Sequence, residues 1–140
     1  MPAPFESSHL KFLYPDNWKL LERSEEEGTD GLTLELPTGG FFSLELEREG
    51  QLEDEVIEEV FDSIQKDYGD VEREESEDDV PMGERLIDFR FFYLDLVIVS
   101  RLMILKVGDA TYILQLQAES RDFEANELVL AAILKQIREA

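Results

Sequence analysis

The chain has 140 residues, 43% of them hydrophobic, which is enough for one domain with a sizeable core. Its 34 acidic residues outnumber 13 basic ones, and the formal charge of −21 repels nucleic-acid phosphate and anionic lipid, so we expect neither as a partner. No cysteine is present, which excludes disulfides, thiolate nucleophiles and zinc–thiolate sites. We therefore expect a single domain over residues 1–140.

The opening residues, MPAPFESSHLKF, contain neither a basic n-region nor a continuous apolar segment, so we expect no secretory signal. The apolar stretch 94–105 is shorter than the roughly 20 residues that a membrane-spanning helix needs, and it includes Asp95 and Arg101. The expectation is a soluble, cytoplasmic protein with no membrane span.

Two short strand patterns begin the chain. Leu10, Phe12 and Tyr14 alternate with other residues until Pro15, where Pro, Asp and Asn favour a turn. Trp18 follows, and we favour a core position beneath this turn over an exposed role as a binding anchor. Residues 32–36 and 42–46 then alternate on either side of a Pro-Thr-Gly-Gly turn, which predicts an antiparallel hairpin with one buried face.

At residues 52–68 the apolar residues recur at the spacing of a helix and no longer alternate. Gly69 is placed to end this predicted helix. The apolar stripe consists of Leu52, Val56, Val60, Phe61, Ile64 and Tyr68. Residues 45–79 contain 17 acids and three bases, a net charge of −14. This charge either belongs to a solvated face that only keeps the protein soluble, or it steers the protein toward a basic partner. The candidate partner surface comprises Glu55, Glu58, Glu59 and Asp62.

Residues 70–79 form an acidic connection that starts as an exposed edge strand. Its carboxylates could attract calcium, but no Asp-x-Asp-x-Asp-Gly loop is present, so we expect a solvated loop and no metal site. The carboxylates in question are Glu74, Glu75, Glu77, Asp78 and Asp79.

The most apolar stretch, residues 97–107, is hydrophobic on both alternating sets of positions. A strand of this kind is typical of a sheet that is covered on both faces. Gly108 and Asp109 then favour a tight two-residue turn, so residues 89–117 are expected to form a central hairpin. A final helix follows residue 119, with an apolar stripe of Phe123, Leu130, Ile133, Leu134 and Ile137. These elements predict an α+β fold, a three-layer α/β/α sandwich whose mainly antiparallel sheet has about six to seven strands.

The order of these elements resembles the PsbP-like fold family, whose members include PsbP, a Ran-binding transport factor, DcrB proteins and chaperones of type VI secretion effectors. The resemblance lies in residues 10–18 (LKFLYPDNW), in 107–114 (VGDATYIL) and in the closing helix, and it extends over essentially the whole chain. It implies an antiparallel sheet with helices on both faces and a non-enzymatic role in binding or assembly. The missing lipidation cysteine and leader argue against a photosynthetic role.

Catalytic and cofactor motifs are scarce. Ser7, Ser8 and His9 are adjacent, and neighbouring side chains of a strand point to opposite faces, so a catalytic triad is not expected. Neither GxGxxG nor GxxxxGK[ST] occurs, and we expect no cofactor.

Five polar residues lie within otherwise apolar strands: Asp88, Arg90, Arg101, Gln115 and Gln117. Unpaired buried charge is costly, so the charged members either pair across strands, which we favour, or line a groove that the helices leave open.

Three functions remain. The first is a non-enzymatic protein-binding or assembly module whose partner is a protein with a basic surface. The second is a chaperone for a secreted effector, which would form a homodimer with an apolar groove. The third is an enzyme or small-ligand carrier with a cleft near Asp88, Arg90 and Arg101.

Overall fold

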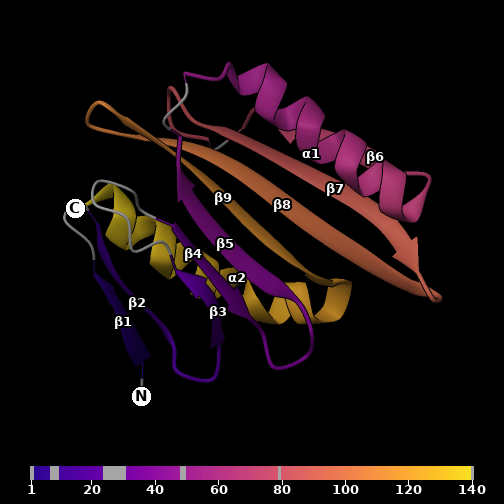
Figure 1. The fold of residues 1–140 in the computed structure, drawn as a ribbon, viewed down its shortest axis with the longest axis horizontal. Helices are drawn as coiled ribbons and strands as arrows, with labels where there is room; N and C mark the ends of the chain where they lie inside the picture. Colours follow the sequence, from indigo (N-terminus) through magenta and orange to yellow (C-terminus); the bar gives the residue numbers. More distant parts are fainter. Residues whose placement is uncertain (1, 7–9, 24–30, 48–49, 79, 140) are drawn as a thin grey trace.

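The computed structural model describes residues 2–6, 10–23, 31–47, 50–78 and 80–139. They form an α+β domain with two helices (Figure 1). In chain order the elements are β1 (Pro2–Glu6), β2 (Lys11–Pro15), β3 (Lys19–Arg23), β4 (Gly31–Glu35), β5 (Phe41–Leu46), α1 (Glu53–Tyr68), β6 (Glu72–Ser76), β7 (Arg85–Tyr93), β8 (Leu96–Val107), β9 (Ala110–Glu119) and α2 (Ser120–Arg138).

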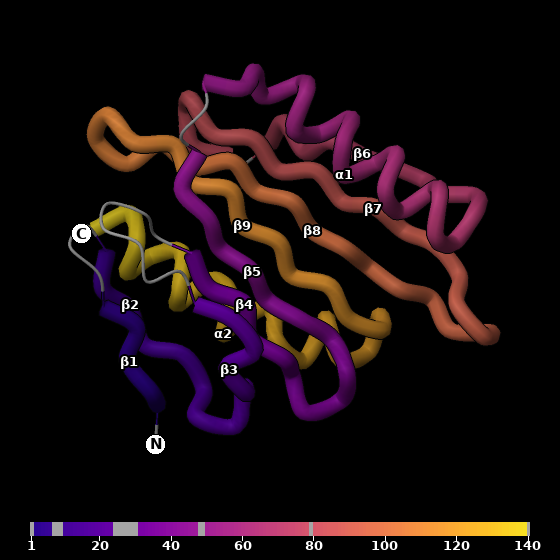
Figure 2. The backbone as a smooth tube through the Cα atoms, viewed as in Figure 1, coloured from indigo at the N-terminus to yellow at the C-terminus, as the bar shows by residue number. Residues whose placement is uncertain are grey.

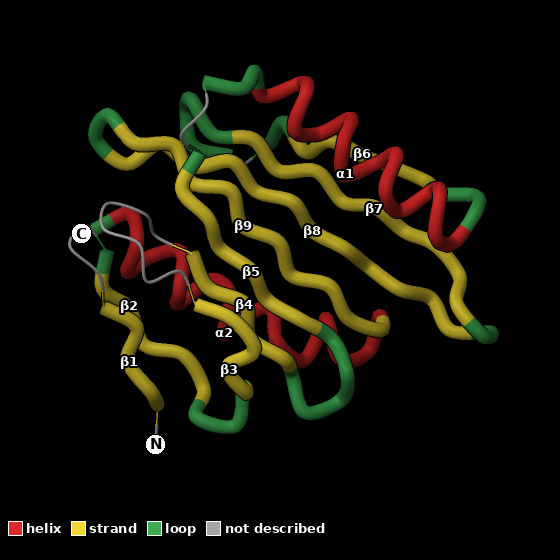
Figure 3. The backbone as a smooth tube through the Cα atoms, in the orientation of Figure 1, coloured by secondary structure: helices red, strands yellow, loops and turns green. Residues whose placement is uncertain are grey.

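The main sheet has seven antiparallel strands in the order β3-β4-β5-β9-β8-β7-β6. This confirms the predicted antiparallel sheet and the edge position of β6. The predicted first strand is present as β2, but it pairs with the unpredicted β1 in a separate two-stranded sheet. Figure 3 shows that the β7–β8 and β8–β9 turns lie at opposite ends of the main sheet.

The β8–β9 hairpin lies inside the sheet, as expected. Its two-residue turn pairs Val107 with Ala110, and Gly108 adopts a φ of 60°, which glycine tolerates easily. Side chains of β8 enter two different hydrophobic clusters, since Met103 belongs to the cluster that contains α2 residues and Leu102 to the cluster that contains α1 residues. The two sets of alternate side chains of this strand therefore pack into different hydrophobic clusters.

Helix α1 ends at Tyr68, and Gly69 follows with a φ of 90°, as its position predicted. Its buried residues are Val56, Ile57 and Ile64. Leu52 was wrongly assigned to the apolar stripe: it precedes the helix and its exposed fraction is 68%, because the contact surface with the sheet begins one turn later.

Helix α2 buries its predicted stripe of Phe123, Leu130, Ile133, Leu134 and Ile137. It packs against β2, β8 and β9. The Glu119 carboxylate accepts a hydrogen bond from the backbone N–H of Arg121 and so caps the first turn. Neither described helix is long and apolar enough to cross a membrane.

The two helices do not cover the sheet equally. Helix α1 lies along the β6 and β7 side, whereas α2 crosses the opposite face behind β5 and β9 (Figures 1 and 2). On the α1 face, the described part of the chain places no helix over β4 and β5 (Figure 2). The hairpin of β4 and β5 accordingly buries Leu34 and Phe42 toward α2, while Thr33 and Ser43 on its other face stay partly exposed.

Candidate functional site

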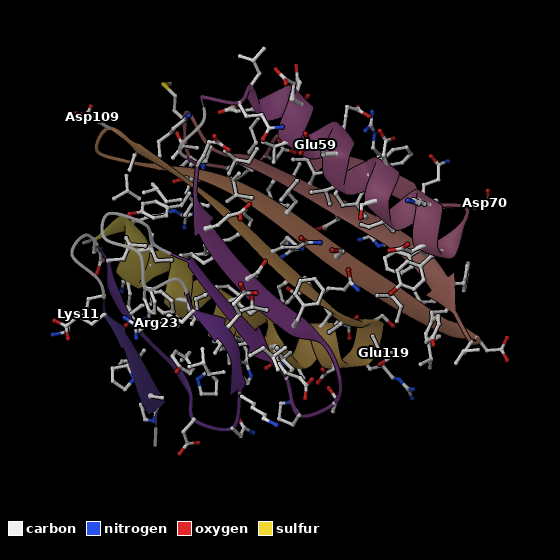
Figure 4. All side chains as sticks on the ribbon, in the orientation of Figure 1. Lys11, Arg23, Glu59, Asp70, Asp109 and Glu119 are labelled. Atoms are coloured by element: carbon white, nitrogen blue, oxygen red, sulfur yellow. The ribbon has the colours of Figure 1, made fainter. Side chains whose placement is uncertain are left out.

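Three cavities lie in a row along β9, and residues of α1 contribute to the lining of each. We call them together the α1–β9 groove. The first, of about 380 Å³, is lined by Thr111 and Ile113 near the β8–β9 turn, and the second, of about 330 Å³, by Gln115 and Gln117. The third, of about 250 Å³, is lined by Gln117 and Glu119 at the end of the strand. Figure 4 labels Asp109 and Glu119, which mark the two ends of this row.

The floor of the groove consists of alternate residues of β9, because alternate side chains share one face of a strand. Gln115 donates a hydrogen bond from Nε2 to Oγ of the fully buried Ser100 at 2.7 Å, which orients the amide in the floor. The wall opposite β5 is formed by α1, through Val60, Ile64 and other residues, and Phe41 of β5 lines the other side. The groove therefore combines amide groups with apolar walls.

The groove is acidic. Among the described residues that line it, one cation is found, Lys106, and its Nζ already lies 3.4 Å from Oε2 of Glu53. Gln51 donates from Nε2 to Oε1 of Glu59 at 2.7 Å, and this bond links the first cavity to the second. The lining carboxylates are those of Glu47, Glu53, Glu59, Asp67, Asp109 and Glu119.

Glu45 adds to this negative potential. It is the cross-strand partner of Ile113, so its side chain is directed to the α1 face beside the groove. Partial burial, and then the nearby charge of Glu47, raise the pKa of the Glu45 carboxyl. Burial is therefore the main reason why ionisation of Glu45 is unfavourable, and the charge of Glu47 is the second.

The predicted acidic surface of α1 is present. Glu55, Glu58, Glu59 and Asp62 are all exposed. Glu58 pairs with Arg73 at 2.7 Å, while Glu59 lines the groove. Glu55 and Asp62 form no ion pair with another described residue. The four carboxylates therefore have different surroundings on the helix.

The five polar strand residues do not form one groove. Gln115 and Gln117 line the α1–β9 groove, but Asp88 and Arg101 lie on the other face of the sheet, where the Arg101 guanidinium is 4.9 Å from the ring centroid of Phe123 in α2. The alternative of a common groove is thus wrong, because cross-strand register places Arg101 opposite Leu116 and not opposite a glutamine.

The favoured alternative, structural pairing, is confirmed. Arg101 donates from Nε to Oδ1 of Asp88 at 2.8 Å and from Nη2 to Oδ2 at 3.0 Å. These hydrogen bonds to Asp88 raise the pKa of Arg101 further above its usual range. Arg90 lies 3.8 Å from both Asp88 and Glu74. Neither Asp88 nor either arginine lines the three cavities described above.

Trp18 is buried in the core, 3% exposed, with its ring centroid 5.9 Å from that of Phe42, as the core interpretation predicted. Ser7, Ser8 and His9 lie outside the described residues, as does Asp79. Within the described ranges, no group of three or more His, Asp or Glu side chains is arranged to hold a metal ion. Glu75 forms an ion pair with Arg85 at 2.6 Å instead.

The structure is a small α+β domain with a seven-stranded antiparallel sheet and two helices. No protein-family model and no curated protein matches the sequence. The structure is similar to the crystal structure of a Pseudomonas aeruginosa protein of unknown function, described as a candidate regulator. The two share 12% sequence identity with a TM-score of 0.50, and the match covers 93% of this chain and 91% of the other. At this identity the similarity concerns the fold alone.

Proposed function

We propose that the domain is a non-enzymatic protein-binding module that holds an extended, basic polypeptide segment in the α1–β9 groove. The observation that carries the proposal is the row of three cavities along β9 whose lining is rich in carboxylates. Pockets for compact small molecules usually have volumes of about 300–1,000 Å³ and are mainly apolar. The first two cavities lie at the lower end of this range and the third lies below it. All three are partly polar, and a row of such cavities fits an extended segment that places one side chain in each.

The polar groups of the groove favour a polypeptide backbone as the ligand. The amides of Gln115 and Gln117 carry both donors and acceptors, as a peptide group does. The carboxylates of Glu59 and Asp67 attract basic side chains, and the net charge of −21 speeds the encounter with a basic partner. An effector chaperone with an apolar groove is less well supported, because these amides and carboxylates would lose hydration without gaining partners.

We also propose that the layers correspond to the α/β/α sandwich of PsbP-like proteins. The support is the presence of two separate hydrophobic clusters, one containing Ile64 of α1 and the other Ile133 of α2, with strand β8 between them. The assignment to this fold family rests on the resemblance of residues 10–18 and 107–114.

A fluorescent peptide of alternating serine and arginine tests the binding function by anisotropy. The protein should bind it, and the affinity should fall as salt is added, since the attraction is electrostatic. Glu59→Gln with Asp67→Asn should weaken binding about three- to tenfold, as expected for two partly exposed charges. Glu55→Gln with Asp62→Asn is the matched control on the same helix, with the same change in net charge and no groove residue.

Equal losses in the two double variants would overturn the groove as the binding site. An alternating serine and glutamate peptide that binds as tightly as the basic one would overturn the electrostatic basis. Preferred binding of an apolar peptide would overturn the proposal in favour of the effector-chaperone alternative.

A further inference from the structure

The third cavity of the groove has an aromatic lining. Tyr68, the last residue of α1, stacks on Phe91 of β7 with a centroid distance of 4.5 Å. Tyr93 meets the same Tyr68 ring edge-on, with centroids 5.7 Å apart and an interplanar angle of 84°. All three rings line the cavity. Phe91 is buried, whereas Tyr68 and Tyr93 are 39% and 50% exposed, so two tyrosine rings at right angles remain accessible.

The rest of the cavity leaves space beside these rings. The β4–β5 turn contributes Gly39 and Gly40, whose lack of side chains keeps this wall open. Leu96 and Ile98 of β8 add apolar surface. The cavity volume of about 250 Å³ is enough for one long side chain but is below the usual volume of a pocket for a whole cofactor.

The electrostatics of the cavity favour a cation. Tyr68 places it at the C-terminal end of α1, where the helix dipole is negative. Asp67 lines the adjoining second cavity. Glu119 also lines the third cavity, but its carboxylate already pairs with Nε of Arg121 at 3.1 Å, so the tyrosine faces supply most of the recognition. Ring faces are negative and attract guanidinium and ammonium groups.

We infer that this cavity receives a basic side chain of the bound segment, with its cation against the rings of Tyr68 and Tyr93. Arginine is favoured over lysine, because its planar guanidinium stacks on aromatic rings and is less strongly hydrated. The inference rests on the proposed function of the groove and assigns a specificity pocket within it. The second and third cavities share Tyr68 and Gln117, so a segment lying over Gln115 and Gln117 reaches the pocket directly.

The test uses a short glycine–serine peptide with one central arginine, together with the same peptide carrying citrulline, which has the same shape without the charge. Binding is followed through the amide signals of Tyr93, Leu96 and Ile98 in NMR titrations. The arginine peptide should shift these signals, and the citrulline peptide should leave them in place. Tyr93→Leu, which keeps an apolar side chain but removes the ring, should weaken binding about two- to fivefold.

Phe92→Leu is the matched control, because Phe92 is the neighbouring strand residue, 71% exposed, and does not line the cavity. It should bind the arginine peptide as the unchanged protein does. Equal binding of the citrulline peptide, or full binding by Tyr93→Leu, would overturn the pocket. If the rim carboxylates Glu59 and Asp67 still mattered for the longer basic peptide, the proposed function would survive that failure. Conversely, arginine-specific shifts without any effect of the rim carboxylates would support the pocket and overturn the groove.

Discussion

Asp88 of β7 and Arg101 of β8 are directly opposite in the sheet and share two hydrogen bonds, of 2.8 and 3.0 Å. The Asp88 residue is only 7% exposed, and the Arg101 guanidinium also lies over the Phe123 ring. This pair therefore links two strands to the first turns of α2. Its position on the α2 face, away from the groove, indicates a structural role.

Removing one member of this pair should destabilise the fold. Arg101→Leu leaves the Asp88 carboxylate with Arg90 at 3.8 Å as its nearest recorded cation, and we expect unfolding free energy to fall by about 2–4 kcal/mol. Asp88→Leu with Arg101→Leu should recover part of this loss, because no charge remains buried. Urea unfolding of the single and double variants measures both effects. A double variant no more stable than Arg101→Leu alone would contradict this account.

Gly40 should tolerate no side chain. A Cβ at this position would lie 2.3 Å from the carbonyl oxygen of Gln117 and 2.9 Å from Cβ of Ala118, so β5 would have to move away from β9. We expect Gly40→Ala to lower the unfolding free energy by about 2 kcal/mol or more, as overpacking does. The third cavity of the groove should change shape as well, because Gly40 lines it.

Gly39→Ala is the control one residue away. A Cβ there meets nothing within 4 Å, and the only penalty is the φ of 101°, worth about 1 kcal/mol. Urea unfolding should rank the two variants, and NMR amide shifts should spread along β5 and β9 only for Gly40→Ala. Equal losses, with shifts confined to the turn in both, would show that β5 and β9 yield without strain.

The sequence predicted the central hairpin and α2 well because their signals are local. A continuous apolar run ending in Gly108-Asp109, and an apolar stripe at helical spacing, each depend on a few adjacent residues. The pairing of β2 with β1 depends on contacts that local patterns do not encode. β1 was missed because Pro2 and Pro4 are poor strand formers and Phe5 is its one buried residue.

The grouping of Arg101 with Gln115 and Gln117 in one candidate groove could have been corrected from the sequence alone. The two-residue turn pairs Val107 with Ala110, and counting back from it places Arg101 opposite Leu116 and Leu102 opposite Gln115. Arg101 and the glutamines therefore had to lie on different faces. The wall contributed by Asp67 and Tyr68 carried no such signal, because it depends on how α1 crosses the sheet.

The sequence pattern did not predict the two-residue turn between β7 and β8. Substitutions in this turn should stabilise the protein. Leu94 and Asp95 have φ values of 49° and 67°, the conformation of a type I′ turn that Asn-Gly adopts more readily. Leu94 is 77% exposed, so its replacement loses little burial. Leu94→Asn with Asp95→Gly should raise the unfolding free energy by about 1 kcal/mol and the Tm by a few degrees. A lower Tm by calorimetry would show that the Leu94 side chain stabilises the hairpin by packing.

Glu45 should make stability depend on pH in the direction opposite to that of most acidic residues. Because the pKa of Glu45 is raised in the folded state, folding favours its protonated form, and the ionised form destabilises the fold at neutral pH. This penalty disappears as the pH falls through the folded pKa. Glu45→Gln, which stays neutral, should therefore be more stable than the unchanged protein at pH 7 and equally stable at low pH.

Thermal unfolding of both proteins between pH 7 and pH 3 measures the difference. The effect should be modest, because Glu45 is an exposed residue and solvent screens its charge. Glu35→Gln on β4 is the control, since Glu35 is also an exposed strand carboxylate but lies one strand farther from β9 than Glu45 does. A Glu45→Gln variant that is less stable at pH 7, or a gain that persists at pH 3, would contradict the assignment of burial as the cause. A gain that is reduced when the basic peptide is present would connect this carboxylate to the groove, because a bound cation offsets the same penalty.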